Sequence, residues 1–214
     1  MVVSALRLYR ELDITHPAQE AEMKHMAKHI ATVTLMLTFG VASTYAHQKP
    51  VKMTFSGTAG ASAIDLQYPG AHTGEDNFAG NGTLGRFTYR DVTAGENSPS
   101  PSSTCSGPSQ VHFLRLAGAA VLRFEDGSLL NVTLTQGDDC IDLAAKEANC
   151  TLTFQIVGGT GRFQNASGTL TLTETPVPVL ANAAHVPAFF VATGEITGTI
   201  SGVTRDEERE DERH

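Results

Sequence analysis

Three polar side chains are expected to point into an apolar interior, and their types could support chemistry. His112, Gln136 and Glu174 each share the parity of apolar side chains in a stretch of alternating residues. An imidazole and a carboxylate at an apolar mouth could act as a general acid–base pair. They could also fix the polar head of an amphipathic ligand. The simpler alternative is a solvated rim, where the alternation ends and polar residues return.

Apolar residues of the same parity are expected to form the walls around these groups. No G-x-S-x-G or HExxH motif is present, and the spacing of His112, His185 and Glu174 resembles no metal-ligand pattern. We therefore expect no metal and no cofactor, and Glu174 and His112 are the candidate catalytic residues. The expected ligand pocket comprises His112, Leu114, Leu134, Gln136, Phe154, Leu172, Glu174 and Phe190.

The elements that must position these residues are strands. In Cys150–Gly158, Leu152, Phe154 and Ile156 alternate with polar residues, and this period of two recurs along the chain. One apolar and one polar face is typical of antiparallel sheets. We predict an all-β fold with strands at 51–59, 61–68, 78–90, 110–124, 128–136, 150–158, 167–175 and 188–201.

An even number of strands allows an up-and-down antiparallel sheet to close into a barrel. Tight turns at 125–127 and 158–166 alternate with longer links at 91–109, 137–149 and 176–187. Alternate connections fall at opposite ends, so the long links share one mouth with His112, Gln136 and Glu174. Eight strands enclose a space that side chains fill or that holds one small ligand.

A glycine-rich segment carries a family resemblance. Ile156–Gly168 (IVGGTGRFQNASG) resembles a GGTGRF-x-x-A-[ST]-G segment of bacterial secreted proteins with an allene-oxide-cyclase-like barrel, and Phe189–Gly202 is also similar. Dirigent proteins have the same type of barrel. The resemblance implies a calycin-like fold over roughly residues 50–202. Plant members include a cyclase that acts on an unstable fatty-acid epoxide, but no catalytic residue can be transferred to this sequence.

Both ends of the chain read as segments outside the barrel. Basic residues after Met23 precede the apolar run Ile30–Thr44, and small residues near Ala46 suit a signal-peptidase site. The run is short for a membrane anchor. We predict an upstream extension at 1–22, a signal peptide at 23–46, the barrel at 47–203 and a disordered acidic tail at 204–214, with Met1, Met23 and Met26 as alternative starts.

Three cysteines are expected at the same mouth. Export to an oxidising compartment, secreted or periplasmic, favours one disulfide and leaves one thiol. Cys140–Cys150 would close a short loop and is the preferred pairing. Cys105 is the alternative partner and would instead fasten the 91–109 link to the rim.

Composition limits the partners. The net charge of −8 argues against nucleic acid, whose binding depends on Lys and Arg, and no membrane contact is expected after signal cleavage. Family analogues often form dimers or trimers, so a homo-oligomer is compatible with the sequence. The expected function is an exported barrel that holds a small apolar or amphipathic ligand. The alternatives are a cofactor-independent cyclase or isomerase that confines a reactive substrate, and a purely structural secreted module.

Overall fold

The computed structural model describes residues 48–100, 105, 110–142, 145, 147–183 and 187–204. The predicted upstream extension and signal peptide, His185, and residues 205–214 of the predicted tail lie outside these ranges. None of the helices formed by the described residues is long and apolar enough to cross a membrane.

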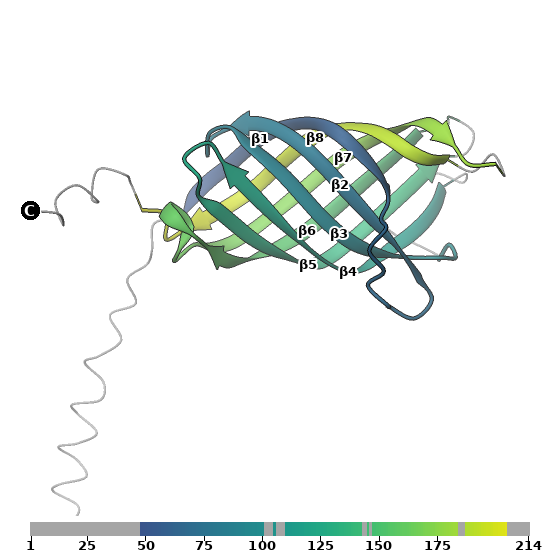
Figure 1. Cartoon of the computed structure of the whole chain (residues 1–214), viewed down its shortest axis with the longest axis horizontal. Coiled ribbons are helices and arrows are strands. Elements are labelled where there is room, and N and C mark those ends of the chain that lie inside the picture. Colours follow the sequence, from purple (N-terminus) through teal and green to yellow (C-terminus); the bar gives the residue numbers. More distant parts are fainter. Residues whose placement is uncertain are drawn as a thin grey trace, which may run out of the picture. The chain divides into compact units, whose positions relative to one another are not determined.

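Eight antiparallel strands form a closed barrel, as predicted (Figure 1). Each strand pairs with the next along the chain, and β8 pairs with β1, for example through Met53 and Ile196. Closure leaves no sheet edge exposed. The strands are β1 (Lys49–Ala61), β2 (Ala71–Gly82), β3 (Phe87–Glu96), β4 (Gln110–Phe124), β5 (Leu129–Asp142), β6 (Glu147–Gly159), β7 (Ser167–Ala181) and β8 (Pro187–Ser201).

The second and third strands differ from the prediction. Residues 62–70 connect β1 to β2, and this connection includes most of the strand predicted at 61–68. The single strand predicted at 78–90 is interrupted by the turn between β2 and β3. Gly85 has a φ of 91° in this turn, and its N–H donates to the carbonyl of Gly82 over 2.9 Å. A positive φ suits glycine. The strand predicted at 78–90 runs through this glycine, so the predicted boundaries of both neighbouring strands are displaced.

The strands reach further at one mouth than the alternation suggested. β5 runs to Asp142 and β6 starts at Glu147, while β7 runs to Ala181 and β8 starts at Pro187. Much of the predicted links at 137–149 and 176–187 therefore belongs to the barrel wall. This extension lengthens the interior at the end where the candidate polar residues were expected.

Packed side chains fill the middle of the barrel. Phe55 stacks on Phe78 with ring centroids 4.5 Å apart, and Phe78 stacks on Tyr89 at 5.5 Å. Phe154 and Leu172, which were expected to line the pocket, are fully buried in this core. Any open interior space must therefore lie between this core and a mouth of the barrel.

The glycine-rich segment that carried the family resemblance closes the opposite end. It contains the short 3₁₀ turn η1 (Gly161–Phe163), in which the Phe163 side chain is completely buried. The Phe163 ring lies 4.8 Å from that of Phe124, and the guanidinium of Arg162 lies over both rings. This end is an apolar stopper, and the segment has a structural role there.

Candidate functional site

Two β-bulges at the same level reverse the direction of side chains in adjacent strands. Ala94 of β3 pairs with Ala117 of β4, but Gly95 pairs with Arg115, so β4 has an extra residue at Leu116. The step from Leu134 to Gln136 in the pairing of β5 with β6 places another extra residue at Thr135. Because side chains alternate along a strand, one extra residue exchanges its inner and outer faces.

The bulges change which residues face the interior. Phe113 and Arg115 of β4 line the cavity, so His112 and Leu114 point to the other face of that strand. Gln136 is exposed, and Leu134 packs against the core below the cavity. The inward placement predicted for His112, Leu114 and Gln136 is wrong, because a constant parity was carried through both bulges.

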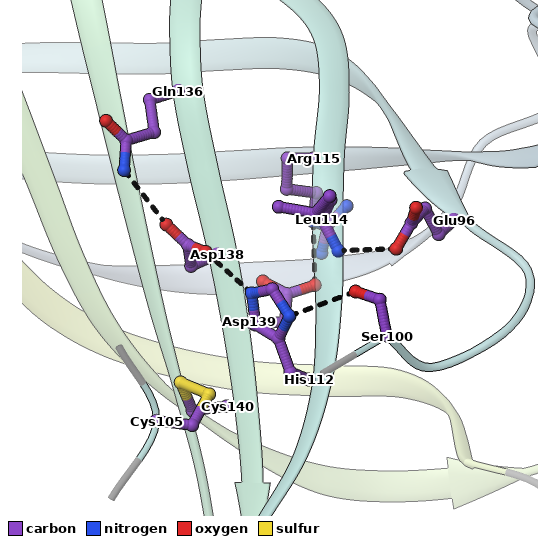
Figure 2. Close-up of polar contacts among 10 residues, drawn as sticks. All are labelled: Glu96, Ser100, Cys105, His112, Leu114, Arg115, Gln136, Asp138, Asp139 and Cys140. Carbon is purple, nitrogen blue, oxygen red and sulfur yellow. Dashed lines mark hydrogen bonds and ion pairs between the residues drawn. A yellow bond between two sulfur atoms is a disulfide. The ribbon is translucent and has the colours of Figure 1, made fainter. Parts of the chain in front are cut away.

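His112 instead belongs to a polar cluster on the outer face. Its Nε2 lies 2.6 Å from Oδ1 of Asp138, and its Nδ1 lies 3.1 Å from Oγ of Ser100. Gln136 donates to the other carboxylate oxygen of Asp138 over 3.4 Å. Figure 2 shows this row of contacts across β4 and β5. The His112 cluster fastens the segment after β3 to the barrel, and none of its members lines the cavity.

The disulfide joins Cys105 to Cys140, with Cα atoms 5.5 Å apart (Figure 2). This corrects the preferred pairing of Cys140 with Cys150. Cys150 lines the cavity, whereas Cys140 lies between Asp139 and Ile141, which both line it, and therefore points outward. Cys140 and Cys150 are close in sequence, but their side chains lie on opposite faces of the barrel wall.

A cavity of about 280 Å³ opens at the mouth above the core. Its volume lies near the lower end of the range for small-molecule sites, roughly 300–1,000 Å³. Its walls are mostly apolar, and its floor carries ionisable groups. The wall includes Ala59, Phe113, Ile141, Ala148, Pro176, Ala188 and Phe190, and the ionisable residues are His72, Asp76, Arg115, Asp139, Cys150 and Glu174.

Arg115 is the central cation of the floor. Its Nε lies 2.7 Å from Oδ2 of Asp139, and one terminal nitrogen donates to Oγ1 of Thr93 over 3.0 Å. Gly137 makes room for it, because a Cβ there would lie 2.5 Å from Cβ of Arg115. Burial disfavours the charged guanidinium, but Asp139, Cys150 and Asp76 together more than offset this and raise the pKa of Arg115. Arg115 therefore stays charged.

Asp76 of the floor is paired with a further carboxyl, Asp91, beneath it. Asp91 accepts the hydroxyl of Tyr89 over 2.7 Å and the backbone N–H of Asp76 over 3.0 Å. Burial raises the pKa of Asp91 to about 6 despite these hydrogen bonds. Burial and the nearby Asp91 raise the pKa of Asp76 well above its usual value. The two carboxyls resist simultaneous ionisation.

Glu174 is the carboxyl that is open to a ligand. It is only 5% exposed and lines the cavity, and its Oε2 has no hydrogen-bond partner among the described residues. Burial raises its pKa to about 7, although Arg115 opposes the rise. Beside it, burial and then Asp139 raise the pKa of the Cys150 thiol, so this cysteine is not an activated nucleophile.

The structure brings together only part of the predicted site. Glu174 and Phe190 line the cavity, and Leu134, Phe154 and Leu172 pack in or against the core. Asp76, Asp91, Arg115 and Asp139 were not predicted. Asp76 and Asp91 share the parity of Phe78 and Tyr89, a signal that the displaced strand boundaries concealed.

The described residues contain no group of three or more His, Cys, Asp or Glu side chains arranged to hold a metal ion. The carboxyls of the floor are arranged around the Arg115 guanidinium instead. The ionisable residues that line the cavity can supply proton transfer and ion pairing.

Comparisons with known proteins do not assign the chain to a family. No family model matches it, and no curated protein matches it. One similar solved structure is the pterocarpan synthase dirigent protein GePTS1, with 11% identity over 74% of this chain and 87% of that one, and a TM-score of 0.36. Another is a nonspecific heme-binding cyclase from neoabyssomicin biosynthesis, with 12% identity over 94% of this chain and 87% of that one, and a TM-score of 0.35.

Proposed function

We propose that this barrel binds one small molecule with an apolar body and a polar group. The observation that carries the proposal is the cavity of about 280 Å³, whose walls are mostly apolar and whose floor holds Arg115 and Glu174. Such a site would bury the body of the ligand by the hydrophobic effect. The few polar groups would fix its orientation.

The contrast between the two ends of the barrel supports a binding role over a purely structural one. Buried charges lower stability unless they are paired, and even paired ones are often less stabilising than apolar packing. The far end is closed by the buried Phe163 ring, and its ion pair of Arg162 with Asp126 is more exposed than that of Arg115 with Asp139. A structural module would gain stability from a second apolar stopper, so the retained carboxyls and Arg115 favour a ligand.

The proposal includes export. The Cys105–Cys140 disulfide supports an oxidising compartment, because cytosolic thiols are kept reduced. Residues 23–46 would be the signal peptide, and the mature chain would begin near His47.

Blocking the cavity tests the binding role. Native mass spectrometry of the purified exported protein is expected to show a bound small molecule, and Ala188→Trp should remove it. Ala188 is partly exposed and lines the cavity, so a large side chain can cover the opening without entering the core. Ala119→Trp, at an exposed position of β4 away from the cavity, is the control. A molecule retained equally by both variants would place the binding elsewhere.

A second candidate function is a cofactor-independent cyclase or isomerase. Glu174 favours it, because a buried carboxyl with a pKa of about 7 can give and take a proton near neutral pH. Protonated Glu174 would donate to an epoxide oxygen as the C–O bond breaks. The carboxylate would then recover a proton from the cyclised product, so the reaction is an isomerisation overall.

Unsaturated fatty-acid epoxides are the substrates to assay. If Glu174 is the acid, Glu174→Gln should lower turnover by about 100-fold or more, the usual contribution of a positioned acid or base. His112→Ala should leave turnover nearly unchanged, since His112 does not line the cavity. Equal turnover in wild type and Glu174→Gln would remove the catalytic role.

A further inference from the structure

We propose that the cavity selects small organic cations, namely amines whose ammonium group contacts Glu174 and whose apolar body lies along Phe113 and Phe190. This inference rests on the proposed binding function and names its ligand class. It starts from the excess of acidic groups on the floor. Asp76, Asp139 and Glu174 line the cavity, yet the one Lys or Arg among its lining residues is Arg115.

Arg115 is already engaged by protein groups. It holds Asp139 through its Nε at 2.7 Å and Thr93 through a terminal nitrogen at 3.0 Å. Asp91, below the cavity, is satisfied by the Tyr89 hydroxyl and the Asp76 N–H. Asp139 and Glu174 both face the cavity with one oxygen lacking a donor among the described residues, but Asp139 already has its ion pair with Arg115, so Glu174 is the better partner for an added positive charge.

A buried carboxylate oxygen gains most from a charged donor. A hydroxyl supplies a hydrogen bond, but an ammonium group also supplies a positive charge, which attracts the carboxylate and opposes the repulsion from the neighbouring carboxyls. A carboxylate ligand would instead add a fifth acidic group near Asp76, Asp91, Asp139 and Glu174. The rings of Phe113 and Phe190 in the wall suit a cation as well, because aromatic faces attract positive charge.

The groups around Glu174 set the direction of the pH dependence. Asp76 of β2, Asp91 of β3, Arg115 of β4, Asp139 of β5 and Cys150 of β6 all lie near it. Burial favours the protonated form of Glu174, with a pKa of about 7. An ammonium ligand requires the ionised form and therefore releases a proton on binding. Affinity for an amine should rise with pH from 6 to 8, whereas affinity for a neutral ligand should not.

The test compares three probes of matched shape: 2-phenylethylamine, 2-phenylethanol and 3-phenylpropionate. Isothermal titration calorimetry at pH 7.5 is expected to give the amine an affinity about tenfold higher than the alcohol, with the carboxylate weakest. Glu174→Gln should abolish this tenfold preference and the rise with pH, while affinity for the alcohol stays within about twofold. Glu147→Gln, at an exposed position of β6, is the matched control and should behave as wild type.

The outcomes separate the ligand class from the binding function. Equal or tighter binding of the alcohol or the carboxylate would overturn the cation proposal and leave the binding function in place. An amine preference that survives in Glu174→Gln would also overturn it, because the cation would then sit elsewhere. Binding of none of the three probes would overturn the cation proposal and count against the binding function itself.

Discussion

Replacing Arg115 with methionine is expected to lower the free energy of unfolding by about 3 kcal/mol at pH 7. The substitution keeps an unbranched side chain of similar length but removes the one guanidinium at the cavity floor. Asp139 would lose its 2.7 Å contact, and Glu174, Asp76 and Asp91 would lose the cation that opposes their mutual repulsion. The value is at the lower end for a broken buried pair, because the Arg115 and Asp139 side chains each keep 18% exposure.

Urea unfolding at pH 7 and pH 5 measures this effect. The loss should be smaller at pH 5, where protonation of the remaining carboxyls relieves their repulsion. Arg123→Met is the control on the same strand, at an exposed position, and should change stability by less than about 0.5 kcal/mol. Adding Asp139→Asn to Arg115→Met should recover part of the loss. Equal losses in the Arg115 and Arg123 variants would show that the floor is not an electrostatic network.

The closed barrel was predictable from the sequence because the alternation of apolar and polar residues identifies the strands even when their boundaries are off by a few residues. In β6 and β7, Phe154 and Leu172 stand out among polar neighbours, and Glu174 follows at the same parity without a bulge. Its inward position could therefore be predicted. The side-chain directions at the cavity end of β4 and β5 could not be predicted, since the extra residues at Leu116 and Thr135 leave no clear mark in composition.

The missed residues show why the chemistry of a barrel interior is harder to predict than its shape. Arg115 has the outward parity in an unbroken strand, and Asp139 falls in the predicted link at 137–149, but the bulges and the longer β5 bring both to the cavity. Since the extra residues lie on adjacent strands at one level, β4 and β5 stay paired on either side, with Leu114 opposite Asp138 and Ala119 opposite Thr133. The interior can thus exchange one set of side chains for another while the sheet remains intact.

The Cys105–Cys140 pairing illustrates a similar limit. Loop length favours Cys140–Cys150, but a bond requires both side chains on the same face of the wall. The bulge at Thr135 directs Asp139 inward and Cys140 outward. On the outer face Cys140 forms the disulfide with Cys105. The pairing thus depends on the bulge in β5, just as the position of Arg115 depends on the bulge in β4.

The pH dependence of stability provides the second large effect. Glu174 has a pKa of about 7 in the folded protein against an ordinary 4.5, and Asp91 has about 6 against 3.8. A raised carboxyl pKa means that the folded state binds protons more tightly than the unfolded state. The stabilisation is fully present below the unfolded pKa and is lost as pH rises through the folded pKa. Wild-type stability should therefore fall between about pH 4 and pH 7.

Glu174→Gln should flatten this decline, because an amide keeps the neutral form at every pH. The free energy of unfolding should rise by about 1–3 kcal/mol over wild type at pH 8, from a shift of a few pKa units at 1.36 kcal/mol each, which already includes the attraction to Arg115. Near pH 4, below the ordinary pKa of 4.5, Glu174 is mostly protonated in both the folded and the unfolded state, and the two proteins should be nearly equal. Urea unfolding across this range measures both, with Glu147→Gln expected to follow wild type. Lower stability of Glu174→Gln at pH 8 would mean that the ionised carboxylate is stabilised by the floor, and that Arg115 outweighs its burial.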